Sequence, residues 1–230
     1  MSDLPLNTII HGDCLDVMRG WPDGCVDAIV TDPPYFLPAA HYALRSGNYR
    51  SLADLSLLEH FYRDAFREII RVLRPSGFAY VFCDGQSYPV FYIHAYAGFK
   101  NLRPLIWDKG TSINGYAWRH QHELVLFCTG HMSPAVPTGD GDILRARAVP
   151  IQSRQHPAEK PVSLIVPLVT KTTPPGGIVL DPFCGSGTTC VAAKREGFNY
   201  IGIDISPDYC EIARRRVAAT EQNLFASNGG

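Results

Sequence analysis

The chain has 230 residues, enough for one well-buried domain and too few for two of ordinary size. Hydrophobic residues make up 46% of the chain and charged residues 19%, and the net charge of −1 excludes a global basic field that would attract nucleic acid. No apolar run is long enough to span a membrane and the N-terminus lacks the features of a signal peptide, so a cytoplasmic location is expected.

Short β-branched or aromatic apolar runs alternate along the chain with longer amphipathic segments, which predicts a parallel sheet covered by helices. The predicted strands are Thr8–His11, Val26–Thr31, Phe78–Cys83, Leu102–Trp107, Glu123–Cys128, Ile178–Leu180 and Tyr200–Ile203. The predicted helices are Leu58–Leu73, Ser87–Ala97, Val162–Thr170, Thr188–Arg195 and Pro207–Ala219. We therefore expect an α/β fold, a doubly wound, mostly parallel seven-stranded sheet with helices on both faces.

Several charged and sulfur-bearing residues are interpreted as structural. The first long helix carries charged residues at helical spacing, which predict a solvated salt-bridge face: Glu59, Arg63, Asp64, Arg67, Glu68 and Arg71. The three arginines at 214–216 are interpreted in the same way. The seven cysteines are scattered singly, without the spacing of a zinc site or of a disulfide framework, so they are expected to be reduced core residues. His120 and His122 lack further ligands, and no metal is expected.

Residues 178–189, Ile-Val-Leu-Asp-Pro-Phe-Cys-Gly-Ser-Gly-Thr-Thr, are typical of a strand, a glycine-rich turn and a helix start. Glycines at 185 and 187 let the backbone approach a ligand, and the helix start favours an anionic group. The Lys-Ser/Thr of a phosphate-cradling loop is absent. The next strand ends in Asp204, about twenty residues on, where a carboxylate accepts hydrogen bonds from ribose hydroxyls. These features predict a cofactor loop for S-adenosylmethionine or NAD.

Residues 27–35, Asp-Ala-Ile-Val-Thr-Asp-Pro-Pro-Tyr, form a strand that runs into two prolines and an aromatic residue. The prolines hold this segment extended and rigid. An exocyclic amine of a base is a poor nucleophile, because its lone pair is delocalised into the ring. Two acceptors on its hydrogens, the Asp32 carboxylate and the Pro33 carbonyl, would favour a pyramidal nitrogen. Tyr35 would stack on a base removed from the duplex.

These segments resemble the motifs of the amino-group DNA methyltransferases, which act on adenine N6 or cytosine N4. The catalytic motif is Asp-Pro-Pro-Tyr at 32–35, and the cofactor motif is Asp-Pro-Phe-Cys-Gly-Ser-Gly-Thr-Thr at 181–189. The catalytic motif comes first, which is the circularly permuted order of the β subgroup. His-Pro-Ala-Glu-Lys-Pro at 156–161 and His-Gly-Asp-Cys at 11–14 also match the subgroup. The resemblance implies a Rossmann-like, permuted methyltransferase fold over nearly the whole chain.

The resemblance also implies the cofactor, S-adenosylmethionine, and the residues of the site. Asp32, Pro33, Pro34 and Tyr35 would be catalytic. Asp13 and Cys14 would contact the cofactor adenine, and Lys160 the methionine carboxylate. The full set of expected cofactor residues is Asp13, Cys14, Asp32, Lys160, Asp181, Phe183, Gly185, Ser186, Gly187, Thr188 and Asp204.

The expected substrate is double-stranded DNA. In the β subgroup a recognition region is usually inserted before the His-Pro-x-x-Lys-Pro segment, but here that interval is only a short connector, 130–155, within a single domain, 1–230. The segments 36–54 and 114–122 mix aromatic and polar residues and are further candidates. Four arginines are expected to contact DNA: Arg45, Arg50, Arg145 and Arg147. Chains of this subgroup often pair, so a homodimer is expected, and the sequence does not reveal whether a cognate restriction nuclease is a further partner.

Adenine is the favoured target, because serine in place of Asp32 is the commoner form for cytosine N4. Cytosine N4 remains the main alternative. Methylation of RNA or of a protein amide is disfavoured by the permuted motif order. An inactive cofactor-binding or DNA-binding module is disfavoured by the intact Asp32 and glycine turn, and a NAD oxidoreductase by the Asp-Pro-Pro-Tyr motif.

Overall fold

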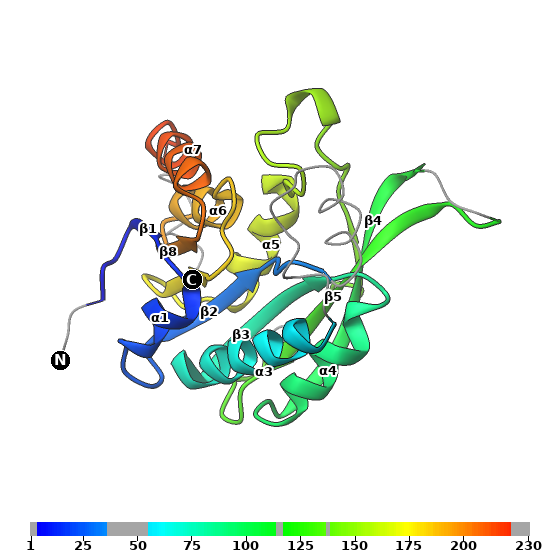
Figure 1. The fold of residues 1–230 in the computed structure, drawn as a ribbon. Coiled ribbons are helices and arrows are strands. Elements are labelled where there is room, and N and C mark those ends of the chain that lie inside the picture. The colour runs from blue at the N-terminus through cyan, green and yellow to red at the C-terminus, as the bar shows by residue number, and fades with distance from the viewer. Residues whose placement is uncertain (1–3, 36–54, 114–116, 137–138, 222–230) are drawn as a thin grey trace.

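The computed structural model describes residues 4–35, 55–113, 117–136 and 139–221. Within these ranges the chain forms an eight-stranded sheet in the order β1-β8-β7-β2-β3-β5-β4-β6 (Figure 1). Strand β5 runs antiparallel to both of its neighbours, and the other neighbouring pairs are parallel. The strands are β1 (Thr8–His11), β2 (Val26–Thr31), β3 (Leu73–Cys83), β4 (Asn101–Ile113), β5 (His120–Thr129), β6 (Ile143–Arg145), β7 (Ile178–Asp181) and β8 (Asn199–Asp204).

Helices cover both faces of the sheet. Helices α1 (Cys14–Arg19), α3 (Leu55–Val72) and α4 (Ser87–Tyr96) pack on one face, and α5 (Val162–Thr172), α6 (Thr188–Arg195) and α7 (Pro207–Ala218) on the other (Figure 1). Strand β2 is buried along its whole length, as expected for a parallel strand with helices on both sides. Its Ile29 packs with α1, α3 and α4, whereas Ala28 and Val30 pack with α5, α6 and α7.

The doubly wound α/β fold predicted from the sequence is confirmed, with one strand more than the seven expected. The additional strand, β6, lies in the interval 130–155 and pairs with Ile106–Asp108 of β4. Three residues are too few to show the alternation by which a strand is recognised. Helix α1 was also missed. It has six residues, and Asp13 caps it by accepting the N–H of Leu15 at 2.7 Å.

The site is built where the winding of the sheet reverses. Strands β7 and β2 lie side by side, and the chain leaves them in opposite directions, through α6 to β8 and through α3 to β3. Ligands of open α/β sheets bind at such a switch point, outside the carboxyl ends of the strands. Asp32 follows β2 directly, and the glycine-rich turn follows β7. The Thr31 hydroxyl donates to Asp181 at 2.7 Å and joins the two motifs.

Two arginines interpreted as solvated are instead anchors between elements. Arg71 of α3 has a side chain only 25% exposed, and it donates to the carbonyls of Met18 and Trp21 and to Glu68. Arg216 of α7, 18% exposed, reaches the glycine-rich turn. Helical spacing identifies the charged face of a helix, but it does not show whether another segment of the chain covers that face.

The interpretation of the cysteines as reduced core residues is confirmed, because all seven are free and buried.

None of the helices in the described ranges is long and apolar enough to cross a membrane.

Candidate active site

A pocket lies at the carboxyl ends of β2 and β7 and contains about 410 Å³ of space, part of it open to solvent. It brings together side chains from the catalytic motif, the glycine-rich turn and the His-Pro-x-x-Lys-Pro segment, although these are far apart in the sequence. The predicted site residues that line it are Asp32, Lys160, Asp181, Phe183, Gly185, Ser186 and Thr188.

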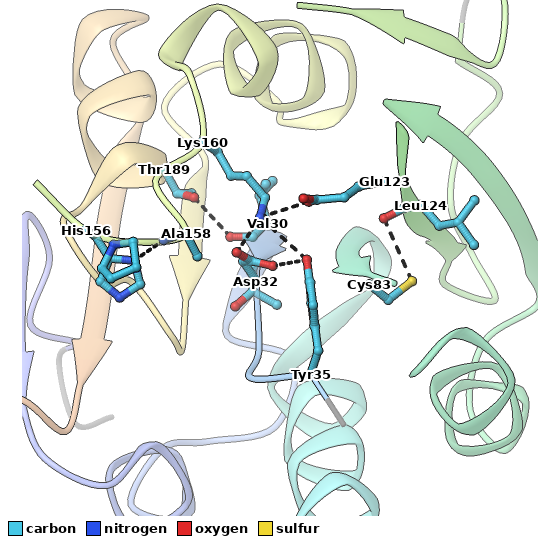
Figure 2. Close-up of polar contacts among 12 residues, drawn as sticks. Val30, Asp32, Tyr35, Cys83, Glu123, Leu124, His156, Ala158, Lys160 and Thr189 are labelled. Carbon is cyan, nitrogen blue, oxygen red and sulfur yellow. Dashed lines mark hydrogen bonds and ion pairs between the residues drawn. The ribbon is translucent and has the colours of Figure 1, made fainter. Parts of the chain in front are cut away.

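The Asp32 carboxylate is held from two sides. The Lys160 ammonium lies 2.6 Å from Asp32 Oδ2, and the Tyr35 hydroxyl donates to Asp32 Oδ1 (Figure 2). Burial raises the pKa of Asp32, and the Lys160 ammonium opposes this by favouring the ionised form. Burial and the Asp32 carboxylate raise the pKa of Tyr35 well above its ordinary value, so the phenol remains a donor.

Lys160 lines the pocket and also has two partners within the chain. The sequence assigns it to the cofactor carboxylate, and in the structure its ammonium lies between Asp32 and Glu123, with Glu123 Oε2 at 3.1 Å. Burial alone would lower the pKa of Lys160, but the two carboxylates raise it above its ordinary value. The Lys160 side chain is thus charged at neutral pH.

Glu123 and Lys109 were not among the predicted site residues. Glu123 extends from β5, and the Lys109 ammonium of β4 lies 2.6 Å from its Oε1. Burial would raise the pKa of Glu123, but the Lys160 and Lys109 ammonium groups hold it below its ordinary value. No local motif marks either residue, and only the pairing of β4 with β5 brings them together.

The two prolines of the catalytic motif differ in their contacts. The Pro34 carbonyl accepts a hydrogen bond from the hydroxyl of Tyr62 on α3, which anchors the motif to the helix. No donor from the described residues reaches the Pro33 carbonyl.

Asp181 is a buried carboxyl at the end of β7. It accepts hydrogen bonds from the Thr31 hydroxyl and from the Phe183 N–H at 3.1 Å. Burial raises its pKa to about 7, although these hydrogen bonds partly oppose the shift. The protonation state of Asp181 therefore changes near neutral pH.

The two glycines of the cofactor turn serve different purposes. Both have positive φ, +49° at Gly185 and +82° at Gly187, a conformation that favours glycine. Gly185 lines the pocket, where an added Cβ would meet the ring of His156 at 3.4 Å. A Cβ on Gly187 would lie 2.7 Å from that of Ala213, so Gly187 is needed for close packing of the turn against α7.

Asp204 lies beside this turn at the end of β8. Its carboxylate accepts the N–H groups of Gly185 and Ser206, each at 2.8 Å. The N-terminal motif is adjacent, because His11 of β1 pairs with Asp204 and the N–H of Gly12 donates to the Asp204 carbonyl. Burial, together with nearby carboxylates, raises the pKa of Cys14 to about 12.

Arg216 completes the turn from α7 and was missed as a site residue. It donates to the carbonyl and hydroxyl of Ser186, at 2.8 and 2.7 Å, and to the hydroxyl of Thr188 at 3.3 Å. Its other terminal nitrogen lies 2.8 Å from Glu159. One side chain thus connects α7, the cofactor turn and the segment that carries Lys160.

Two of the four arginines assigned to DNA can be placed. Arg145 belongs to β6, next to Asp108 of β4, and an added Cβ at Gly110 would lie 4.0 Å from the Arg147 side chain. Both therefore lie beside the long β4–β5 hairpin, which projects from the body of the protein (Figure 1). Trp118, 87% exposed, and Arg119 lie on the return of this hairpin. Arg45 and Arg50 lie outside the described residues.

The pocket lies at the switch point of the sheet. It combines the Asp32 carboxylate beside two prolines with a glycine-rich turn beside the Asp204 carboxylate. Fold and site together indicate a cofactor-dependent enzyme of the methyltransferase class. Residues 26–215 match the DNA methylase family whose members act on N6 or N4 amines, and the chain belongs to this family. S-adenosylmethionine is the cofactor of the family, and DNA is its substrate.

Relatives along the whole chain agree with this assignment. The chain is 34% identical over 224 residues to "Putative methylase YubD" of Escherichia coli K12, covering 95% of this chain and 93% of that protein. It is 28% identical over 255 residues to type II methyltransferase M.HinfI of Haemophilus influenzae, covering 95% of this chain and 70% of that protein.

Solved structures share the fold. TTHA0409 of Thermus thermophilus, complexed with S-adenosyl-L-methionine, superposes with a TM-score of 0.68 at 25% identity, covering 92% of this chain and 94% of that one. The cytosine-N4-specific PvuII DNA methyltransferase superposes with a TM-score of 0.72 at 18% identity, covering 94% and 87%.

The pocket of this chain suits S-adenosylmethionine chemically. Its lining combines the carboxylates of Asp32 and Asp181, which favour a cationic ligand, with the ring of Phe183 and the polar turn. The sulfonium and ammonium groups of the cofactor are cations, and its adenosine is aromatic and polar.

Proposed function

We propose that the protein methylates the N6 amine of adenine within a short DNA site. The observation that carries the choice of base is Asp32 as the first residue of the catalytic motif, since serine there is commoner among the enzymes that act on cytosine N4. The likeness to the cytosine-N4-specific PvuII enzyme, at 18% identity, is one of fold alone and does not favour cytosine.

The chemistry follows from the two acceptors. The Asp32 carboxylate accepts one N–H of the target amine and the Pro33 carbonyl accepts the other, so that the nitrogen becomes pyramidal and its lone pair is freed. Asp32 Oδ1 and Oδ2 are already engaged by Tyr35 and Lys160, but an ionised carboxylate has about four lone-pair sites, which leaves room for the amine. The ring of Tyr35 stacks on the base removed from the duplex.

The cofactor is held by the residues around the glycine turn. We assign the ribose hydroxyls to Asp204, the adenine to Asp13 and Cys14, and the methionine carboxylate to Lys160. The remaining cofactor contacts are assigned to Asp32, Asp181, Phe183, Gly185, Ser186, Gly187 and Thr188. When bound, S-adenosylmethionine supplies a methyl group activated by its sulfonium. The protein supplies positioning and electrostatics, because the reactive group belongs to the cofactor.

Residues 1–230 act, in this proposal, as a single domain in which the connector 130–155 replaces a recognition domain. The position of Arg145 and Arg147 beside the β4–β5 hairpin supports a DNA-contacting surface there. Arginine suits both phosphate contacts and guanine edges.

The proposal is tested by digesting DNA incubated with the protein and S-adenosylmethionine, followed by nucleoside mass spectrometry. N6-methyldeoxyadenosine is the expected product, and N4-methyldeoxycytidine would show that the alternative target is correct. Asp32→Ala should lose methyl transfer by about a hundredfold or more while still binding S-adenosylhomocysteine, because one catalytic hydrogen-bonding group is removed. Wild-type turnover of Asp32→Ala would contradict the mechanism.

The assembly is proposed on the family resemblance. We expect a homodimer, and sedimentation that shows only monomer at micromolar concentration would exclude it. A cognate restriction nuclease also remains a prediction, and restriction of unmodified phage DNA by cells that carry the neighbouring genes would reveal one.

A further inference from the structure

We propose that Glu123 is a positioning residue for methyl transfer. It pairs with the Lys160 ammonium, so this cation neutralises Asp32 less completely and Asp32 stays a strong hydrogen-bond acceptor for the target amine. The inference rests on the proposed role of Asp32, but not on whether the base is adenine or cytosine.

The first support is an unbroken chain of close polar contacts. It runs from Tyr35 through Asp32 and Lys160 to Glu123 and ends at Lys109 (Figure 2 shows the first four). Lys160 Nζ is 2.6 Å from Asp32 and 3.1 Å from Glu123, so one ammonium serves two carboxylates. The Lys160 side chain is only 8% exposed, and the Phe82 and Trp107 rings lie 5.2 and 5.8 Å from its nitrogen.

The second support is the charge of this cluster. A buried ammonium bonded to Asp32 alone would neutralise the carboxylate and weaken it as an acceptor. With Glu123 present, the Lys160 ammonium is divided between two carboxylates, and Lys109 balances the second one, so the four charged groups are neutral as a whole. Because Lys109 lies at the far end, the excess negative charge stays near Asp32, where an amine gains positive charge on methylation. Lys109 binds the far oxygen of Glu123 and fixes its position on the β4–β5 hairpin. Removing one partner from a buried ion pair leaves an uncompensated charge, so each member depends on the others.

The third support is the burial of the Glu123 oxygen that faces Lys160. Oε2 is shielded from solvent and lies 3.1 Å from the Lys160 nitrogen. A buried carboxylate oxygen is costly without a cation beside it, so the position of Glu123 is tied to that of the Lys160 ammonium, which also contacts Asp32.

The acid limb of the pH–rate profile provides a readout that a merely structural role would not move. Within the part of the chain that the structure describes, the ionisable groups that act on Asp32 are Tyr35 after β2, Cys83 of β3, Glu123 of β5, His156 and Lys160 before α5, and Asp181 of β7. Glu123 raises the pKa of Asp32 and Lys160 lowers it. Transfer requires ionised Asp32, so the rate falls as pH drops through this pKa.

The experiment measures single-turnover methylation of duplex DNA from pH 4.5 to 8, at saturating S-adenosylmethionine, for three variants. Glu123→Gln should slow transfer about tenfold and move the acid limb to lower pH, a smaller loss than for removal of a direct catalytic group. Lys160→Met should move the limb to higher pH. Lys109→Gln, at the edge of the cluster, should also move it to higher pH, because Glu123 then acts more fully on Lys160.

Glu211→Gln, which removes an exposed carboxylate on α7, is the matched control and should leave rate and limb unchanged. Repeating the series on Asp181→Asn separates the titration of Asp181 from that of Asp32. Thermal melting and S-adenosylhomocysteine binding show whether each variant folds. If Glu123→Gln does not fold, Lys109→Gln still tests the inference.

The outcomes separate this inference from the proposed function. If Asp32→Ala is inactive while Glu123→Gln and Lys109→Gln keep the wild-type rate and acid limb, Glu123 is not a positioning residue. If Asp32→Ala retains turnover, the acceptor mechanism itself fails. A loss of cofactor binding in Glu123→Gln, with an unshifted limb, would also overturn the inference.

Discussion

Arg216 of α7 forms an ion pair with Glu159 at 2.8 Å, and the same guanidinium donates to the cofactor turn at Ser186. Glu159 immediately precedes Lys160, so this one contact relates the position of the cofactor loop to that of the catalytic cluster. The pair is largely shielded, with side chains 18% and 7% exposed. Buried charged pairs of this kind are costly to break, because the remaining partner is left without compensation.

We therefore predict that Arg216→Met weakens S-adenosylhomocysteine binding about tenfold, equivalent to about 1.4 kcal/mol. The loss arises because Ser186 and Thr188 lose their common donor. Isothermal titration calorimetry measures it directly. Arg215→Met is the control, since Arg215 is 69% exposed and has only a 3.8 Å contact with Glu211. Equal affinities of the two variants would contradict an anchoring role.

Asp204→Ala should weaken cofactor binding by about 1.5–3 kcal/mol, the usual worth of hydrogen bonds to a charged group. The effect has two sources, because the carboxylate fixes the N–H of Gly185 in addition to its proposed contact with the ribose. Asp204→Asn retains one acceptor and should lose less. An unchanged dissociation constant for Asp204→Ala would remove this residue from the cofactor site.

The sequence predicted the parts of the site that lie on continuous motifs. Asp32 and the turn around Gly185 were identified because each follows a short apolar strand, and parallel strands bring their carboxyl ends to one edge of the sheet. Glu123 could not be found in this way, since it lies within an ordinary strand pattern and acquires its partner, Lys160, only through the fold. Lys160 was recognised as a site residue from its motif, whereas its contacts with Asp32 and Glu123 follow only from the fold.

Asp181 should make cofactor binding depend on pH near neutrality. Burial raises its pKa from 3.8 to about 7 in the folded protein. Between about pH 4 and 7 the folded state therefore holds a proton that the unfolded chain has lost, so this group's contribution to stability falls as pH rises through that window. A cationic ligand favours ionised Asp181. The affinity of the protein for S-adenosylmethionine should therefore increase as pH rises through about 7, and below that pH binding of the cofactor should release a proton from Asp181.

The measurement is calorimetric titration of S-adenosylmethionine between pH 6 and 8 in two buffers of different ionisation enthalpy. In Asp181→Asn, whose amide does not titrate, both the pH dependence in this window and the proton release should disappear. Burial lowers the pKa of His156, which also lines the pocket, so His156→Gln is the companion variant that separates its titration from that of Asp181. A wild-type pH profile in Asp181→Asn would refute the assignment.

Specificity should be limited by the small surface available to read DNA. An interval of about 25 residues supplies two or three base-edge contacts, each worth roughly 1–3 kcal/mol of discrimination. We predict a target of about four or five base pairs that tolerates substitution at one position or more. Single-molecule sequencing of DNA from cells that express the protein would give both the modified base and the site.

Because the net charge is −1, binding should depend on a few arginines, and the variants to test are Arg45→Ala, Arg50→Ala, Arg145→Ala and Arg147→Ala. Replacing an arginine that contacts a phosphate should weaken binding to every DNA sequence. It should also reduce the slope of log affinity against log salt concentration by about one. An arginine on a base edge should instead relax one position of the site. Arg145 and Arg147 lie together beside the β4–β5 hairpin, so we expect their effects to be coupled rather than additive. A long, strictly read site with methylcytosine as product would defeat this account.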